Sequence, residues 1–232
     1  RIMGVEEVVH ASTIATNAIR GQIGLELPKT ALITTRGFRD VIEIARQNRP
    51  RLYDLFFDKP KPLIPRDLRF EIDERTDAYG NILKRVDPLM VEELGNILYS
   101  KGVESIAVCF LRSIVNPANE VKAGEVLSKF FKYISLSHRV ACEPREYERF
   151  STTVLNAVLM PIISKYIESI EEYLRSRGVE RFYIMSSNGG LIDVYEAKFR
   201  PIQLIESGPA AGIVAVSEIS KLINERRVIG FD

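Results

Sequence analysis

The sequence contains few of the residues that build covalent or metal frameworks. Its 232 residues include two cysteines, Cys109 in an apolar run and Cys142 in a loop-like segment. Their number and separation match neither a metal-binding spacing nor a disulfide framework. Because this low cysteine usage is typical of a reducing compartment, we expect a cytoplasmic protein.

An excess of charge and a long hydrophobic run are also missing. The 32 basic and 31 acidic residues leave a formal net charge of +1, so no global field attracts nucleic acid or an anionic membrane. The longest apolar runs, such as VLNAVLMPII at residues 154–163, are far shorter than the roughly 20 residues that span a bilayer. No secretion signal opens the chain. We therefore expect neither nucleic acid nor a membrane among its partners.

Three common catalytic motifs are absent as well. The chain has no phosphate-binding P-loop, no G-x-S-x-G nucleophile motif and no Cys/His metal cluster, which excludes the enzyme classes that those motifs define. It begins without a methionine and ends in RRVIGFD, a stretch typical of a β-strand. We expect a piece of a longer protein.

What is present is an alternation of strand-like and helix-like segments. Apolar residues at three- and four-residue spacing predict a helix over Val5–Arg20, and four prolines exclude a regular helix between residues 48 and 69. We predict strands over residues 30–35, 104–111, 133–140 and 181–190, of which the last runs into a glycine-rich turn, and a hairpin over 68–83. We predict further helices over residues 38–47, 91–102, 116–131, 146–177 and 207–223. This alternation predicts an α/β fold with a largely parallel or mixed sheet.

The stretch HASTIATNAI, residues 10–19, carries many polar groups for an apolar segment. On a helix, His10, Thr13 and Asn17 lie on adjacent turns of one face, with Thr16 beside them. An imidazole, hydroxyls and a carboxamide on one face can position a polar substrate or phosphate oxygens. The alternative is that the hydroxyls bond to helix carbonyls and His10 is satisfied near the helix start.

Two small-residue stretches stand at element ends, where α/β folds place ligands. In SSNGG (186–190) and ESGPAAG (206–212), glycines and a helix start leave backbone amides open to an anion. An ordinary turn and close helix packing are the alternatives. The candidate binding residues are Ser187, Asn188, Gly189, Gly190, Ser207, Gly208 and Gly212.

A third candidate is RQNRP, residues 46–50. Arg46 and Arg49 can hold a carboxylate or phosphate by paired hydrogen bonds, and Asn48 between them is a further binding candidate. Pairing of the arginines with nearby acidic residues is the alternative. The charged stretch REYERFSTT, residues 145–153, mainly describes a solvated helix entry.

Taken together, HASTIATNAI, ALITTRGFRDVIEIARQNRPRLYDL, REYERFSTTVLNA, SNGGL and SGPAAG occur in an order that resembles the N-terminal half of the hydantoinase A and 5-oxoprolinase family. The resemblance covers nearly the whole chain. That family usually has Gly and Thr where this chain has Ala11 and Ser12, a conservative departure.

The resemblance implies an actin-like and sugar-kinase-like (ribonuclease H-like) ATPase lobe, with a mixed sheet and flanking helices, incomplete at both ends. It implies that residues 1–227 form the first lobe without its opening phosphate hairpin, and that residues 228–232 are the first strand of the second hydantoinase A lobe. ATP and Mg²⁺ are the implied cofactors. Asp232 would begin the second phosphate and metal motif.

The implied function is an ATP-dependent hydrolase subunit that opens a cyclic amide, such as 5-oxoproline or a hydantoin, through a phosphorylated intermediate. The fragment alone is expected to be inactive. Within this resemblance His10, Thr13 and Asn17 are the catalytic candidates, and Thr16, Arg46, Asn48 and the two small-residue stretches bind substrate or phosphate. The alternatives are a subunit of an ATP-dependent ketone carboxylase, acting on acetone or acetophenone, and a non-catalytic interaction domain.

The resemblance also implies a hydantoinase B-like partner subunit. The long helix predicted over 146–177 has an apolar face suited to the core or to such a partner, and we expect the core. The residues of this face are Leu155, Val158, Leu159, Ile162, Ile163, Tyr166 and Ile170.

Overall fold

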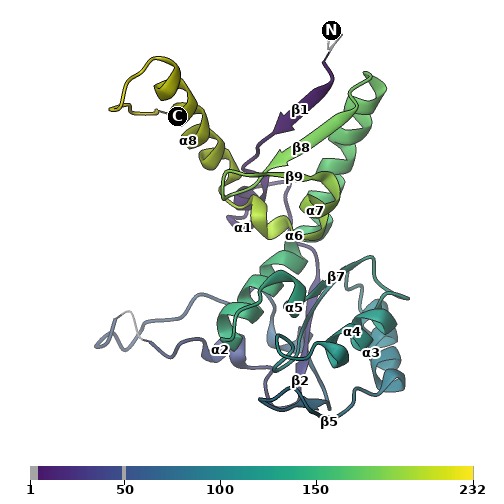
Figure 1. Cartoon of the computed structure of the whole chain (residues 1–232). Coiled ribbons are helices and arrows are strands. Elements are labelled where there is room, and N and C mark those ends of the chain that lie inside the picture. Colours follow the sequence, from purple (N-terminus) through teal and green to yellow (C-terminus); the bar gives the residue numbers. More distant parts are fainter. Residues whose placement is uncertain (1–4, 49–50, 232) are drawn as a thin grey trace. The chain divides into compact units, whose positions relative to one another are not determined.

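The structure is a computed structural model that describes residues 5–48 and 51–231. The chain forms two compact units, each with its own sheet and core (Figure 1). Unit 1 contains residues 1–27 and 159–232, and unit 2 contains residues 28–158. The α/β fold class predicted from the sequence is confirmed.

Unit 2 is built on a four-stranded parallel sheet in the order β3-β2-β6-β7. Every residue of β2 and β6 is buried, as expected for strands covered on both faces. The strands are β2 (Thr30–Thr35), β3 (Arg69–Ile72), β6 (Ser105–Cys109) and β7 (Tyr133–Leu136), and a small antiparallel hairpin is formed by β4 (Arg75–Thr76) and β5 (Ile82–Lys84). The helices of this unit are α2 (Val41–Ile44), η1 (Arg66–Leu68), α3 (Pro88–Ser100), α4 (Ala118–Leu127) and α5 (Ser137–Val140).

A buried carboxylate ties α4 to the carboxyl ends of β6 and β7. Glu120 is fully buried and accepts hydrogen bonds from Phe110 N and Ser137 Oγ, both at 2.9 Å, and from His138 N and Nδ1 at 2.9 and 2.7 Å. These partners follow β6 and β7 directly. A buried charge is tolerated only when it is satisfied in this way.

A second buried carboxylate lies beyond the end of β3. Glu74 accepts hydrogen bonds from Thr35 Oγ1 and, at 2.7 Å, from Asn119 Nδ2. Burial raises the pKa of the Glu74 carboxyl, and the neighbouring charge of Glu120 acts in the same direction. The folded protein therefore binds the Glu74 proton more tightly than the unfolded chain does.

Unit 1 contains a three-stranded mixed sheet. Strand β8 (Arg181–Met185) pairs in parallel with β1 (Glu7–His10) and antiparallel with β9 (Leu191–Asp193). The helices are α1 (Ile14–Ile19), α6 (Glu146–Ser176, which begins in unit 2), α7 (Val194–Phe199), η2 (Pro201–Leu204) and α8 (Ser207–Leu222). The core of this unit is small and consists of Ala15, Ala18, Leu159, Ile163, Ile167, Ile184, Ala197 and Leu204, with partly buried neighbours.

Helix α6 supplies both hydrophobic cores. Its first half places Phe150, Val154, Ala157 and Val158 in unit 2, and its second half places Leu159, Ile163 and Ile167 in unit 1. It is long and apolar enough to cross a membrane, but 67% of its most apolar window is buried in the protein, as in a core helix. The predicted core role is confirmed, and the helix continues through Pro161.

Four predicted elements need correction. The helix predicted over residues 5–20 is wrong at its start, because residues 7–10 form β1 and α1 begins only at Ile14. The apolar spacing that predicted a helix here also fits a short strand of valines, and pairing with β8 selects the strand. The strand predicted over 133–140 ends at Leu136, and α5 begins at Ser137. The helix predicted over 38–47 contains only Val41–Ile44. The predicted hairpin is confined to residues 75–84, because β3 joins the parallel sheet.

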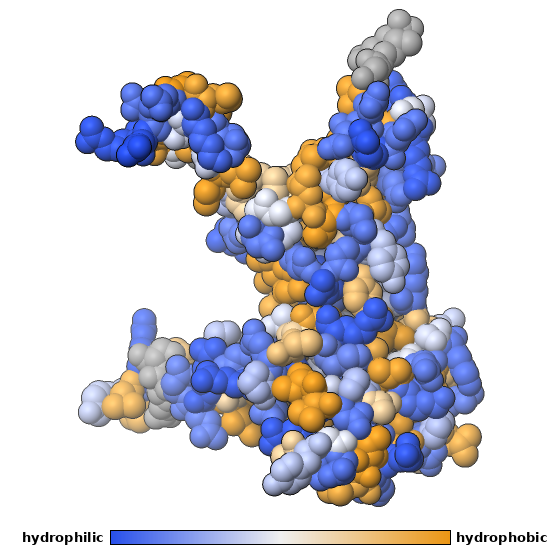
Figure 2. All heavy atoms as spheres, in the orientation of Figure 1, coloured by the Kyte–Doolittle hydropathy of each residue, from blue (hydrophilic) through white to orange (hydrophobic). Residues whose placement is uncertain are grey.

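Helix α8 is joined to the rest of unit 1 mainly near its start. Its later residues include the exposed side chains of Ile213, Ile219 and Leu222, visible as orange surface on the segment that carries α8 (Figure 2). Residues 228–231 lie outside helices and strands. The predicted lobe boundary at residue 228 stays a prediction, and Asp232 lies outside the described residues.

The raised pKa of Glu74 predicts a defined pH dependence of stability. As pH rises from the ordinary carboxyl pKa of 4.5 through the raised folded-state pKa, the wild type loses stability because the buried group must ionise. Glu74→Gln cannot titrate, so its free energy of unfolding should increase relative to that of the wild type across this window. Urea unfolding at pH about 4 and about 8 measures the difference.

Glu125→Gln makes the same chemical change at an exposed position of α4 and is the matched control. A difference between Glu74→Gln and the wild type that stays constant across this pH range would contradict the assignment.

Candidate functional site

The candidate site is built around a hydrogen-bonded junction between two distant segments of unit 1. Ser207 Oγ, at the start of α8, donates to Ser12 O at 3.0 Å and accepts from Ser12 N at 3.5 Å. One residue earlier, Glu206 N donates to Thr16 Oγ1 at 3.1 Å. We call these contacts the Ser12–Ser207 junction. The hydroxyls of Thr16 and Ser207 are therefore used to hold α8 against α1.

The absence of a side chain at Gly208 permits this close approach. A Cβ atom at Gly208 would lie 3.0 Å from Thr13 Cγ2, whereas one at Gly212 would meet nothing within 4 Å. Thr13 Oγ1 accepts a hydrogen bond from Asn17 Nδ2 at 3.3 Å, across one turn of α1. Close packing thus explains Gly208 and not Gly212.

The glycine-rich turn after β8 also contacts α8. Asn188 Oδ1 accepts from Ser186 Oγ at 2.7 Å and from Gly190 N at 3.0 Å, which closes the turn. Gly189 has φ +83°, and a Cβ atom there would lie 3.2 Å from Val214 Cγ2 of α8. The side chain of Ser187 is exposed, and its amide donates to Gln203 O at 2.7 Å. The turn and α8 are therefore neighbours.

His10 is the last residue of β1, not part of a helical face with Thr13 and Asn17. It lies beside Ile184 in the parallel pair β1–β8. His10 therefore lies at the same edge of the sheet as the turn at 186–190, which follows β8. The arrowheads of β1 and β8 mark this edge and point toward α1 (Figure 1). Its Nε2 atom lies 2.7 Å from the hydroxyl of Tyr166 on α6. Burial lowers the pKa of His10, which favours the neutral imidazole at pH 7.

The start of α8 is the part of this junction suited to an anion. The internal hydrogen bonds of the helix begin with Ala210 N to Glu206 O at 3.2 Å, so the amides of Ser207 and Gly208 precede the ladder. Pro209 has no amide hydrogen. A helix of 16 residues presents a partial positive charge at this end. The site can hold a phosphate or another oxyanion without a positively charged side chain.

The candidates in unit 2 are placed separately. Arg46 Nε donates to Glu148 Oε1 at 2.7 Å, so the alternative of pairing with a nearby acid describes this arginine, and Asn48 is exposed. No group of three or more His, Cys, Asp or Glu residues suited to a metal ion occurs within residues 5–48 and 51–231. The metal role of Asp232 and the binding roles of Arg46 and Asn48 stay predictions, and Arg49 lies outside the described residues.

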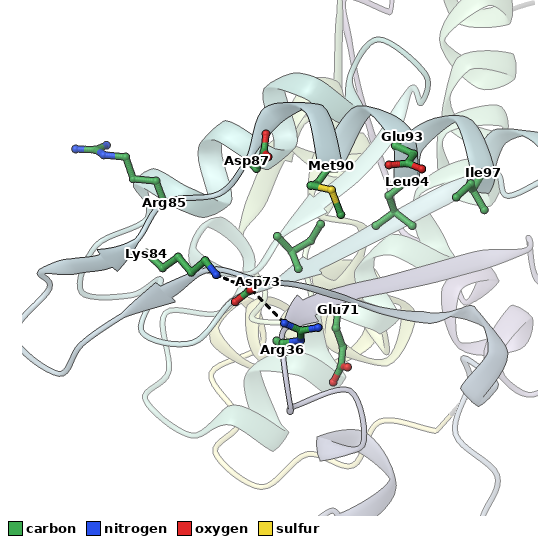
Figure 3. A pocket seen from close by; sticks show the side chains of 11 residues that line it. Arg36, Glu71, Asp73, Lys84, Arg85, Asp87, Met90, Glu93, Leu94 and Ile97 are labelled. Carbon is green, nitrogen blue, oxygen red and sulfur yellow. Dashed lines mark hydrogen bonds and ion pairs between the residues drawn. The ribbon is translucent and has the colours of Figure 1, made fainter.

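Unit 2 contains a cavity of about 510 Å³ that the sequence motifs do not predict. Arg36 Nη1 and Lys84 Nζ both contact Asp73 Oδ2, at 3.2 and 2.5 Å, and the apolar side chains of Met90 and Leu94 line the opposite side of the cavity (Figure 3). The hydrogen bond from Lys84 is the main reason that the pKa of Asp73 is lowered. None of the residues predicted to be functional lines this cavity.

The parallel and mixed sheets and their flanking helices place the chain in one fold class, that of the actin-like ATPases. Two solved structures share this fold over 94% of the chain: the ATP-dependent caprolactamase from Pseudomonas jessenii, with a TM-score of 0.81 and 28% identity, and a nucleotide-free acetone carboxylase, with a TM-score of 0.79 and 21% identity. The chain covers 32% of each of those chains.

The chain belongs to the hydantoinase/oxoprolinase family. Residues 1–131 match the model of the hydantoinase/oxoprolinase N-terminal region, and residues 149–232 match the hydantoinase/oxoprolinase model. The family resemblance of the sequence motifs is confirmed.

Three relatives illustrate the range of this family. An uncharacterized protein of Methanocaldococcus jannaschii is 46% identical over 97% of the chain, and the 5-oxoprolinase of Saccharomyces cerevisiae is 32% identical over 100% of it. The acetophenone carboxylase gamma subunit of Aromatoleum aromaticum is 28% identical over 98% of the chain. The chain spans 34%, 20% and 33% of the lengths of these relatives, respectively.

The close approach at the Ser12–Ser207 junction can be tested by introducing a larger side chain at Gly208. Gly208→Val should destabilise the protein by about 1–3 kcal/mol, because the new side chain meets Thr13 where no space exists. Gly212→Ala, in the same helix but with open space around it, should be neutral or stabilising by up to about 1 kcal/mol. Denaturant unfolding of both variants measures the contrast, and equal effects would refute the packing assignment.

Proposed function

We propose that this chain is part of an ATP-dependent enzyme that opens a cyclic amide of the 5-oxoproline or hydantoin type. The observation that carries the proposal is the Ser12–Ser207 junction, which gathers His10, the amides at the start of α8 and the turn at 186–190 at one end of β1 and β8. The names of the 5-oxoprolinase and caprolactamase relatives support the reaction class.

The start of α8 has the features of a helix N-terminus that binds the phosphate groups of a nucleotide. Anions bind helix N-termini because unpaired amides and the helix dipole both face them, and the first turn of α8 offers the amide of the partly exposed Gly208 beside a glycine-rich turn. When bound, ATP would supply a phosphoryl group that activates the carbonyl-derived oxygen of an otherwise unreactive lactam. The protein then mainly positions groups and neutralises charge.

Individual residues take distinct roles in this proposal. The amide of Gly208 holds a phosphate or oxyanion, and His10 interacts with an oxygen of the substrate or phosphate. Thr16 and the Ser207 hydroxyl maintain the geometry through their internal hydrogen bonds. Thr13 and Asn17 are bonded to each other on α1, and we assign them a supporting role beside the site.

A ketone carboxylase is the second candidate, and the acetophenone carboxylase relative supports it. In both reactions phosphorylation would activate an oxygen, so the junction serves either equally well. Because that relative is named as one subunit of an enzyme, we propose a separate partner subunit of the hydantoinase B type for this protein also. Mg²⁺ would accompany ATP, held by residues that include Asp232.

The reaction is tested by measuring ATP hydrolysis in the complete protein with its partner subunit. Addition of 5-oxoproline or a hydantoin should stimulate hydrolysis if the protein is a cyclic amidase. Stimulation only by acetone or acetophenone together with bicarbonate would select the carboxylase. A folded protein that binds ATP and responds to none of these substrates would favour the interaction domain over both enzymes.

Replacement of His10 separates a functional role from a structural one. His10→Ala should lower substrate-stimulated turnover by about 10²-fold or more, as expected for a group that acts at the reacting oxygen, with a much smaller effect on unfolding. His138→Ala removes the second histidine, whose ring bonds to Glu120 in unit 2, and should mainly reduce stability. Unchanged turnover in His10→Ala would rule out the proposed role of His10.

A further inference from the structure

The contact between His10 and Tyr166 is a feature that the sequence motifs do not explain. Tyr166 lies on α6, 156 residues away in the chain, and its hydroxyl is 2.7 Å from His10 Nε2. The two rings are tilted with centroids 5.7 Å apart, and Phe182 of β8 flanks His10 at 6.4 Å. The two aromatic rings beside the imidazole thus come from α6 and β8, which both contribute to the unit 1 core.

The position of Tyr166 is itself fixed by packing. Ile163 and Ile167 on the same helix are fully or almost fully buried in the unit 1 core, so α6 has little freedom to move the phenol away. His10 is fixed from the other side, because β1 pairs with β8 in register through His10 and Ile184. The hydrogen bond therefore joins two well-anchored elements.

The direction of this hydrogen bond depends on the tautomer of His10, and its length suits donation by the phenol hydroxyl. A separation of 2.7 Å is typical of an O–H donor and lies at the short limit for an N–H donor. A phenol hydroxyl can donate, and the unprotonated nitrogen of a neutral imidazole can accept. When Nε2 accepts, the single hydrogen of the neutral ring is on Nδ1.

We propose that Tyr166 is a positioning residue that donates its hydroxyl hydrogen to His10 Nε2 and thereby holds His10 as the Nδ1–H tautomer. Within residues 5–48 and 51–231, His10 Nδ1 makes no hydrogen bond. The Nδ1–H group is then free to donate to a ligand oxygen. Its use on a substrate or phosphate oxygen rests on the proposed function.

This arrangement makes His10 a neutral hydrogen-bond donor and not a general base. A neutral imidazole can polarise a carbonyl or stabilise a developing oxyanion without carrying charge. The lowered pKa of His10, caused by burial, works in the same direction because it keeps the ring neutral near pH 7. Donation from Tyr166 stabilises the same neutral form.

The tautomer can be measured directly in the 232-residue chain. Only two histidines are present, so ¹⁵N-detected NMR of the imidazole rings gives two sets of signals, and His138 serves as an internal reference. His10 should carry its hydrogen on Nδ1 in the wild type. Tyr166→Phe, which keeps the ring and removes the hydroxyl, should shift His10 toward the Nε2–H tautomer and raise its pKa.

Tyr173→Phe is the matched control, because Tyr173 is an exposed tyrosine on the same helix; it should leave His10 unchanged. In the complete enzyme, Tyr166→Phe should lower kcat about 10-fold or more, as replacements that disturb the orientation of a functional histidine do, with little change in the KM for ATP.

Two results would overturn the assignment: an Nε2–H tautomer in the wild type, or an Nδ1–H tautomer that Tyr166→Phe does not alter. Absence of all ATP turnover in the complete protein would instead count against the proposed function, because the tautomer measurement does not depend on activity. A wild-type kcat in Tyr166→Phe, with the tautomer changed, would refute the catalytic consequence of the positioning.

Discussion

The hydrogen bonds between Ser207 and the backbone of Ser12 connect residues 195 positions apart in the chain, and the candidate site depends on them. They bring the start of α8 to the segment between β1 and α1. Together with the bond from Glu206 N to Thr16 Oγ1, this contact holds the start of α8 close to the residues that follow His10. The fully buried Ser207 makes the junction a structural element as much as a binding one.

The junction also accounts for the polar residues in HASTIATNAI. Thr16 accepts from Glu206 N at the start of α8, Ser12 Oγ accepts from Ile14 N, Thr13 bonds to Asn17, and His10 bonds to Tyr166. Each of these groups therefore has a hydrogen-bond partner, as polar groups in partly buried positions require. What remains available for a ligand is small and specific: one imidazole nitrogen and the backbone amide of Gly208 at a helix start.

Unit 2 uses buried polar groups for a different purpose. Glu120 accepts four hydrogen bonds from groups that follow β6 and β7, and Glu74 joins β2 to α4 through Thr35 and Asn119. These carboxylates hold the carboxyl edge of the parallel sheet together. They were not predicted from the sequence, because a glutamate is usually exposed and only the folded chain surrounds it with donors.

The sequence alone determined the α/β class, the positions of most helices and strands, and the family. Strong local patterns explain this success: β-branched runs define β2 and β6, Asn116 and Pro117 precede α4, and Gly178 follows the end of α6. The family was predicted from the order of the five motifs, because that order depends on residue identity and not on conformation.

Only the tertiary structure decided which candidates meet. It made His10 the end of a strand, because pairing with β8 outweighs a local helical spacing, and it placed Tyr166 against that histidine from a helix whose face otherwise packs in the core. It also paired Arg46 with Glu148. Contacts between residues more than 100 positions apart depend on how sheets and helices pack, and short-range sequence patterns carry no information about them.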